Sequence, residues 1–193
     1  MSRVVAGAAG GMTLANVPGT ATRPTTDRVK EALFSRLESY DVIHDAVVLD
    51  LFAGSGALGA ECASRGAARV ELVELAEKAA AVCRRNAEMI NSVLRRAVVQ
   101  VHRTGAEGYL ARLQEGRHYN LVLIDPPYPL AEDKLAEILA LLEPFLAEGS
   151  VVVVERSSRS PEPCWPAGLE CFSGRKYGET QLWFAEPVLS QHE

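Results

Sequence analysis

Residues 46–59 read AVVLDLFAGSGALG, an apolar run that leads into a glycine-rich turn and then into the start of a helical pattern. The apolar run of 46–52 has the length and composition of a short strand buried on both faces. Glycine lets the backbone turn sharply and approach a ligand closely, and the start of a helix offers free N–H groups. The stretch therefore predicts a strand, a ligand-binding turn and a helix over 57–66.

The same alternation of strand and helix patterns continues for about the next hundred residues. Further strands are expected at 69–75, 98–103, 119–125 and 150–156, and further helices at 76–92, 106–115 and 131–147. Short apolar strands that alternate with helices predict an α/β fold, a doubly wound parallel sheet covered on both faces. Prolines at 161, 163 and 166 then mark a loop, and 169–174 and 180–186 are expected to form a closing antiparallel pair.

A helix is also expected ahead of the sheet, in the segment RPTTDRVKEALFSRL of residues 23–37. Thr25 or Thr26 can cap its start, and apolar side chains recur every four residues from Val29 to Leu37. We expect a hairpin within the glycine-rich residues 3–20. The predicted organisation is an N-terminal hairpin-like extension over 1–22, a main domain over 23–189 and a tail over 190–193.

Composition limits the functional classes. A chain of 193 residues with 48% hydrophobic content is expected to form one domain with a sizeable core. It contains no run of eighteen apolar residues, so no membrane span is expected. The four cysteines lack CxxC spacing and are predicted to be reduced thiols of a cytoplasmic protein. The net charge of −5 does not suggest nucleic-acid binding, although residues 1–36 carry five basic and two acidic side chains.

The glycine turn allows two interpretations. The spacing Gly54-x-Gly56-x-x-Gly59, with Glu74 at the end of the next strand, matches the dinucleotide fingerprint and so allows a nicotinamide or flavin enzyme. Asp50 lies just ahead of the glycines, where it would repel a pyrophosphate but suit a ligand that carries an ammonium group. S-adenosylmethionine carries such a group and a ribose diol that Glu74 could bind, so this cofactor is favoured. The glycines could instead serve only tight packing.

A second motif, NLVLIDPPYP at 120–129, ends the fourth predicted strand. If that strand lies beside the first, Asp125 lies next to the glycine turn. The two prolines fix φ and prevent a helix from starting there. An amino group would then meet the Asp125 carboxylate and the Pro126 carbonyl, and the Tyr128 ring offers a face on which a base can stack.

These groups suit methyl transfer to the exocyclic amine of a nucleobase. Hydrogen bonds from the amine to Asp125 and Pro126 direct its lone pair toward the methyl group and stabilise the charge that grows on nitrogen. No covalent nucleophile is needed. The alternative is that the prolines merely end a strand and that Tyr128 caps it.

Together, RPTTDRVKEALF (23–34), LDLFAGSGALG (49–59), Glu74 and DPPY (125–128) closely resemble the RsmD family, methyltransferases that modify the N2 amine of a guanine in 16S ribosomal RNA. The resemblance covers roughly residues 3–187. DPPY is shared by many amino-methyltransferases, so the segment 23–34 is the narrower marker. The resemblance implies a Rossmann-like S-adenosylmethionine-dependent methyltransferase sheet of seven strands, the last of them antiparallel.

The resemblance also implies roles for individual residues. The expected catalytic residues are Asp125, Pro126 and Tyr128. The expected cofactor-binding residues are Thr25, Asp50, Phe52, Ala53, Gly54, Gly56, Glu74, Leu75 and Ala106. The expected RNA-binding residues are Arg23, Arg28, Lys30, Arg175, Lys176 and Tyr177. The expected partner is ribosomal RNA or an assembling small ribosomal subunit, and the protein is expected to act as a monomer without metal or membrane.

Two positions depart from the family pattern. Where relatives often carry Asp or Asn after the third strand, this chain has Thr104-Gly105-Ala106, so adenine recognition is expected to rest on the Ala106 amide. The N-terminal hairpin lacks the usual basic element, since residues 11–14 read GMTL.

Alternative functions are amino-methylation of DNA adenine or protein glutamine, an NAD-dependent oxidoreductase, and an RNA-binding assembly factor without catalysis.

Overall fold

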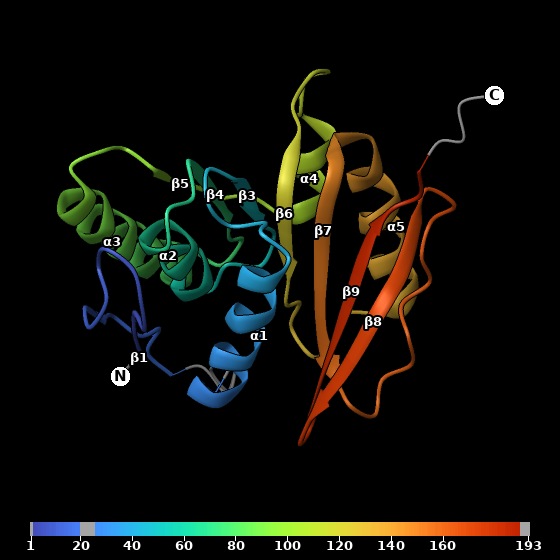
Figure 1. Cartoon of the computed structure of the whole chain (residues 1–193), viewed down its shortest axis with the longest axis horizontal. Coiled ribbons are helices and arrows are strands. Elements are labelled where there is room, and N and C mark those ends of the chain that lie inside the picture. Colours follow the sequence, from blue (N-terminus) through green and yellow to red (C-terminus); the bar gives the residue numbers. More distant parts are fainter. Residues whose placement is uncertain (1, 20–25, 190–193) are drawn as a thin grey trace.

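The computed structural model describes residues 2–19 and 26–189, and a seven-stranded sheet forms its centre (Figure 1). The order of the strands across the sheet is β5-β4-β3-β6-β7-β9-β8. The strands are β3 (Val47–Asp50), β4 (Arg69–Val73), β5 (Val99–His102), β6 (Tyr119–Ile124), β7 (Leu146–Ser157), β8 (Leu169–Tyr177) and β9 (Thr180–Pro187). The first five are parallel, and β9 is antiparallel to both of its neighbours. The predicted α/β sheet with an antiparallel last strand is confirmed.

Helices cover both faces of the sheet (Figure 1). The helices are α1 (Asp27–Ser39), α2 (Ala57–Ser64), α3 (Glu77–Leu94), α4 (Ala106–Ala111) and α5 (Glu132–Leu142), followed by a 3-10 turn, η1 (Glu143–Phe145). Helices α1, α2 and α3 share one apolar core with one face of the sheet, and α4 and α5 share a second core with the other face. In β6, Leu121 and Leu123 enter the first core while Val122 and Ile124 enter the second. This two-sided burial explains why the strand is a continuous apolar run.

Three boundaries differ from the sequence-based expectation by four residues or more. The helix expected over 131–147 ends at Leu142, because Pro144 lacks the N–H that would continue it and lies instead in the 3-10 turn. Strand β7 consequently begins at Leu146, where it pairs with Tyr119. The helix expected over 106–115 ends at Ala111.

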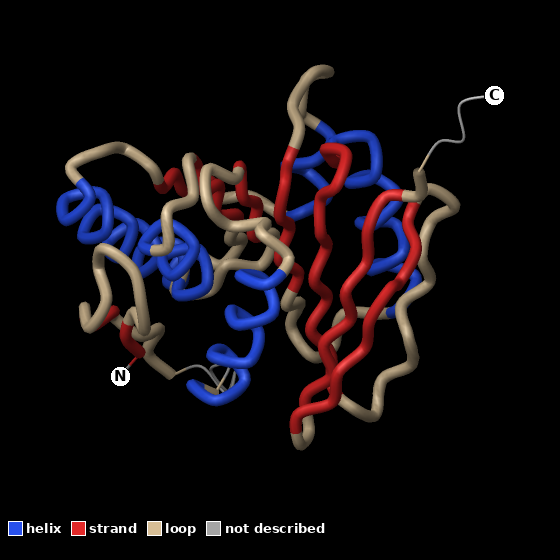
Figure 2. Tube along the Cα trace, in the orientation of Figure 1, coloured by secondary structure: helices blue, strands red, loops and turns tan. Residues whose placement is uncertain are grey.

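Helix α1 begins at Asp27, and the hydroxyl oxygen of Thr26 accepts a hydrogen bond from the Val29 N–H at 3.3 Å. Thr26 is therefore the capping residue of the two that were considered, while 23–25 lie outside the described residues. The connection between β7 and β8 is a long loop, as the prolines predicted (Figure 2). Within residues 2–19 and 26–189, no helix is long and apolar enough to cross a membrane.

The N-terminal segment contains a short antiparallel pair, β1 (Ser2–Arg3) with β2 (Thr13–Leu14), inside the range where a hairpin was expected. Between these strands the backbone docks on α2. The N–H groups of Val5 and Ala6 donate to the carboxylate of Glu61, at 2.9 and 3.1 Å. Apolar side chains of this segment are part of the first core. The division of the chain near residue 22 stays a prediction.

Candidate functional site

Three carboxylates lie where three adjacent parallel strands end. Asp50 is the last residue of β3, Glu74 follows β4 directly and Asp125 follows β6 directly. The register places Asp50 opposite Leu72 of β4 and Leu123 of β6. The expectation that the fourth strand lies beside the first is therefore confirmed. This edge of an open α/β sheet is where such folds bind ligands.

The glycine turn is built from two left-handed residues with different surroundings. Gly54 has φ +57° and Gly56 has φ +82°, a region that glycine occupies without strain. A Cβ on Gly56 would approach the Cys83 sulfur to 2.9 Å, and one on Gly59 would approach Leu72 to 2.3 Å. A Cβ on Gly54 would meet nothing within 4 Å. Gly56 and Gly59 are therefore required by packing, whereas Gly54 leaves open space beside the carboxylates.

Glu74 holds the turn in place. Its carboxylate accepts hydrogen bonds from the N–H of Gly54 at 2.8 Å and from the N–H of Ala76 at 3.0 Å. Each carboxylate oxygen has a second lone pair, so the side chain can still accept hydrogen bonds from a hydroxyl-bearing ligand.

Asp50 is buried, with 2% of its surface exposed, and accepts one hydrogen bond, from the Phe52 N–H at 3.3 Å. Burial raises the pKa of this carboxyl to about 8, and the negative charges of Asp125 and Glu74 add to the rise against the effect of the Phe52 hydrogen bond. A buried carboxylate among like charges is stabilised by a cation. An ammonium group on a ligand fits this position.

Asp125 is half-buried at the same edge of the sheet. Withdrawal from water raises its pKa to about 6, and the positive charge of Arg156 opposes the rise. The carboxyl is thus mostly ionised at neutral pH, so both of its oxygens act as hydrogen-bond acceptors. A negatively charged carboxylate can accept a hydrogen bond from an amino group and thereby orient it.

The residues after Asp125 form an extended turn, as expected from the two prolines. The Leu130 N–H donates to the Pro127 carbonyl at 3.0 Å, and α5 does not begin until Glu132. Pro126 is buried, but 78% of the Tyr128 side chain is exposed. The aromatic ring therefore stands at the protein surface, where a base could stack on it.

The other residues expected near the cofactor have varied surroundings. Ala106 is buried at the first position of α4, Phe52 is partly buried against the second core and Leu75 is 68% exposed. The N–H of Ala53 donates to the Val73 carbonyl at 2.9 Å, so this amide already has a partner within the sheet. Thr25 lies outside the described residues.

One of the expected RNA-binding residues is wrong. Lys30 is buried, and its ammonium group lies 3.2 Å from Glu61 and donates to the Arg3 carbonyl at 3.0 Å. The signal was present in the sequence, because Lys30 lies three and seven residues before Leu33 and Leu37, on the face of α1 that enters the core.

The remaining basic residues differ in accessibility. Arg28, Arg175 and Lys176 are exposed. Tyr177 is partly buried, and its hydroxyl accepts a hydrogen bond from Arg36 at 3.4 Å. Arg23 lies outside the described residues. The hairpin that carries Arg175 and Lys176 joins β8 to β9 at the edge where β7 ends, because Thr180 pairs with Ser157.

The sequence reasoning missed Arg156, near the end of β7. Only 8% of its surface is exposed, and it donates to the carbonyl of Leu130 at 3.0 Å and to the carboxylate of Glu132 at 2.7 Å. The available signal was a basic residue at the carboxyl end of a buried strand, on the same edge as the three acids.

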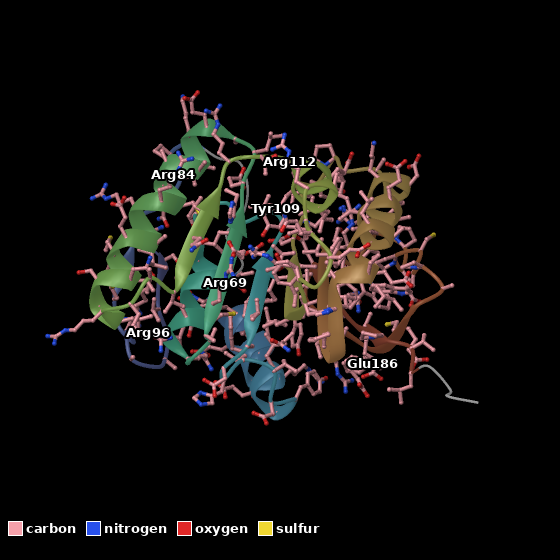
Figure 3. All side chains as sticks on the ribbon, turned by 90° about the horizontal axis from the view of Figure 1, so that it is seen from above. Arg69, Arg84, Arg96, Tyr109, Arg112 and Glu186 are labelled. Atoms are coloured by element: carbon pink, nitrogen blue, oxygen red, sulfur yellow. The ribbon has the colours of Figure 1, made fainter. Side chains whose placement is uncertain are left out.

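A second charged cluster lies away from this edge. Glu71 is buried in the middle of β4, and its carboxylate pairs with Arg69 and Arg117 and is hydrogen-bonded to His102. Figure 3, seen from above, labels Arg69 on β4 and Tyr109 on α4. The paired charges make this cluster a structural support for the edge of the sheet rather than a second open site.

Comparison with known proteins gives consistent results. The family described as conserved hypothetical protein 95 matches residues 2–186. The ribosomal RNA small subunit methyltransferase D of Escherichia coli K12 is 36% identical over 167 residues, which cover 86% of this chain and 79% of that protein. The putative rRNA methyltransferase YlbH of Bacillus subtilis is 34% identical over 181 residues, 92% of this chain and 95% of that protein. The solved structure of the putative methyltransferase yhhF from Escherichia coli superposes with a TM-score of 0.80 at 33% identity, covering 96% of this chain and 97% of that one.

Proposed function

The chain belongs to the family described as conserved hypothetical protein 95, that of the RsmD methyltransferases, and we propose that it methylates the N2 amine of a guanine in 16S ribosomal RNA with S-adenosylmethionine as donor. One observation on the structure of this protein supports the proposal most directly. The pairing of Asp50 with Leu123 places the glycine turn after β3 next to the Asp125 turn after β6. The sites that we propose for the donor and for the amine are thus adjacent on one sheet edge.

Three features support S-adenosylmethionine as the ligand of the glycine turn. No cation of residues 2–19 or 26–189 pairs with the buried Asp50, and the ammonium group of the cofactor would supply one. Glu74 has lone pairs left for the ribose hydroxyls, and Gly54 leaves space for close approach. When bound, the cofactor supplies an electrophilic methyl group. The further residues proposed to contact it are Phe52, Ala53, Gly56, Leu75, Ala106 and Thr25.

Asp125, Pro126 and Tyr128 are proposed to hold the guanine. The Asp125 carboxylate, ionised above pH 6, accepts a hydrogen bond from the N2 amine, and the Pro126 carbonyl accepts the second. Tyr128 is free to stack on the base, since most of its ring is exposed. The two hydrogen bonds orient the amine and stabilise the positive charge that develops on it.

The basic residues that we propose to contact RNA are few. Arg28, Arg175 and Lys176 are exposed, and Arg23 is proposed to join them. A protein that neutralises few phosphates binds RNA weakly, and its binding weakens further as salt rises. Recognition of RNA shape would supply the rest, either on ribosomal RNA or on an assembling small subunit. We propose a monomer that acts in the cytoplasm, without a metal ion.

The proposal is tested by incubating the protein with methyl-labelled S-adenosylmethionine and small ribosomal subunits from a strain that lacks the family's modification. Nuclease digestion should then give labelled N2-methylguanosine, and the Asp125→Ala protein should give none. Label in protein or in DNA, with none in RNA, would overturn the proposal. The oxidoreductase alternative is checked by thermal shift. Because three carboxylates line the crevice and repel a pyrophosphate, S-adenosylhomocysteine should stabilise the protein and NAD should not.

A further inference from the structure

Arg156 connects β7 to the turn that follows Asp125. Its Nη2 atom donates both to the carbonyl oxygen of Leu130 and to the carboxylate of Glu132, the first residue of α5. The side chain is almost completely buried, so these bonds lie in an environment of low dielectric. A hydrogen bond between charged groups in such surroundings is stronger than one at the surface.

The turn has few other restraints. Within residues 2–19 and 26–189, Arg156 is the only residue whose side chain donates to a backbone oxygen of 126–131. The turn's own hydrogen bond joins Leu130 to Pro127. Pro126 and Pro127 have no N–H to donate, so the backbone cannot hold itself against the sheet as a helix start would. The guanidinium of Arg156 therefore fixes the far end of the turn.

The same side chain provides the positive charge that acts on Asp125. Among the described residues, the charges that act on Asp125 are those of Asp50 from β3 and Arg156 from β7, with Glu132 of α5 paired to Arg156. Of these, Arg156 favours the ionised carboxylate and Asp50, once ionised, opposes it. The balance of charges at Asp125 thus depends on a residue of the next strand, β7, 31 positions further along the chain.

We infer that Arg156 is a positioning residue, which holds the turn after Asp125 in the geometry required for methyl transfer and acts on Asp125 through its positive charge. The inference rests on the proposed function for its catalytic part. Its structural and electrostatic parts concern the free protein. They can be measured without any substrate.

Three substitutions separate the two contributions of Arg156. Arg156→Gln removes the charge and weakens the hold on Leu130, whereas Arg156→Lys keeps the charge but loses the planar guanidinium. Glu132→Gln keeps an oxygen that can accept from Arg156 but removes the negative charge that offsets it. The exposed Arg159, three residues further along, provides a control of equal charge change in Arg159→Gln.

The first experiment records the pH dependence of kcat with saturating RNA and cofactor. Arg156→Gln should move the acidic midpoint upward by about 1 pH unit and lower kcat at pH 7 by about tenfold or more. Arg156→Lys should restore the midpoint but only part of kcat, and Glu132→Gln should move the midpoint downward. Affinity for S-adenosylhomocysteine should stay within about threefold in all of them, and Arg159→Gln should leave the midpoint unchanged.

Two further measurements use the free protein. The carbon-13 signal of the Asp125 carboxyl, followed by NMR, should titrate at higher pH in Arg156→Gln and at lower pH in Glu132→Gln. Hydrogen exchange at Leu130 and its neighbours should be faster in Arg156→Gln than in Arg159→Gln. Unchanged titration and unchanged exchange would overturn the inference. If the unaltered protein fails to methylate ribosomal RNA, the proposed function falls, and these two measurements still decide the role of Arg156. If Arg156→Gln does not fold, Arg156→Lys and Glu132→Gln carry the test.

Discussion

The carboxylate of Glu74 accepts a hydrogen bond from the backbone N–H of Gly54 at 2.8 Å, so the end of β4 fixes the turn that follows β3. The two residues are twenty positions apart in the chain, yet the parallel pairing of β3 with β4 brings them together. Glu74 thus shapes the turn in addition to its proposed contact with the ribose. A substitution there should affect cofactor binding through both effects.

We expect Glu74→Ala to weaken binding of S-adenosylhomocysteine by about 10- to 100-fold, because it removes hydrogen bonds to a charged acceptor and loosens the turn. Glu74→Gln should be milder, since one amide oxygen can still accept from Gly54. Isothermal titration calorimetry measures both. An Ala variant that binds as tightly as the unaltered protein would show that Glu74 has neither role.

Asp125 should behave in the opposite way. Asp125→Ala is expected to lower kcat by about 10²- to 10³-fold, because the amine loses its charged acceptor, while affinity for S-adenosylhomocysteine changes less than about threefold. The measurement is single-turnover methyl transfer together with calorimetry. If Asp125→Ala and Glu74→Ala lose affinity equally, the division of roles between the two acids is wrong.

Asp50 should make cofactor binding depend on pH. With its pKa raised to about 8, the free protein carries this group mostly protonated at pH 7, and binding of an ammonium group should release close to one proton. Affinity for S-adenosylhomocysteine should therefore rise about tenfold per pH unit below pH 8. Calorimetry in two buffers of different ionisation enthalpy counts the proton, and Asp50→Asn should abolish both the release and the pH dependence.

The same pKa predicts an effect on stability. The folded pKa of Asp50 lies above its ordinary value of 3.8, so the free protein loses stability as pH rises from about 4 toward 8. Asp50→Asn removes this loss and should raise the Tm of the cofactor-free protein more at pH 8 than at pH 5. Thermal melts at the two pH values check the sign. An equal change at both would mean that the carboxyl is not desolvated.

Lys30 and Arg28 form a matched pair two residues apart on α1. Lys30→Met leaves Glu61 buried with one fewer cation. It should lower the free energy of unfolding by about 3 kcal/mol, which corresponds to a drop in Tm of roughly 6–10 °C. Arg28→Ala should leave Tm within about 1 °C but weaken RNA binding and reduce its dependence on salt. Thermal melts and RNA titrations distinguish them. Weaker RNA binding by a fully stable Lys30→Met protein would restore the original expectation.

Tyr128 should contribute to RNA affinity through its ring and not its hydroxyl. Tyr128→Ala is expected to raise KM for RNA by about 10- to 100-fold, the loss of one base stacked on an aromatic side chain, whereas Tyr128→Phe should stay near the unaltered value. Because the ring is exposed, neither change should alter Tm appreciably. Equal KM values for Ala and Phe would exclude stacking.

The sequence predicted most of the fold because its strands are buried on both faces and therefore appear as short apolar runs between turns. It failed where a proline ended α5 early and where β7 began at Leu146, four residues before the expected start at residue 150. Asp50, Glu74 and Asp125 were predictable because each ends a strand. Arg156 was not, because its role depends on the return of the chain to Leu130, which no local pattern records.

Lys30 shows a different limit. Its charge suggested a surface role, while its position three residues before Leu33 placed it on the buried face of α1. Lys30 follows its position on the helix and is buried, because Glu61 provides a buried partner for its charge. That partner belongs to α2, and the pairing of two charged residues thirty-one positions apart cannot be derived from either segment alone.

The docking of the N-terminal segment on α2 has a consequence for biosynthesis. The N–H groups of Val5 and Ala6 find their acceptor, Glu61, about 55 residues later in the chain. During translation, residues 5 and 6 are synthesised before that acceptor exists. They can therefore make these two hydrogen bonds only after α2 has been synthesised and has left the exit tunnel.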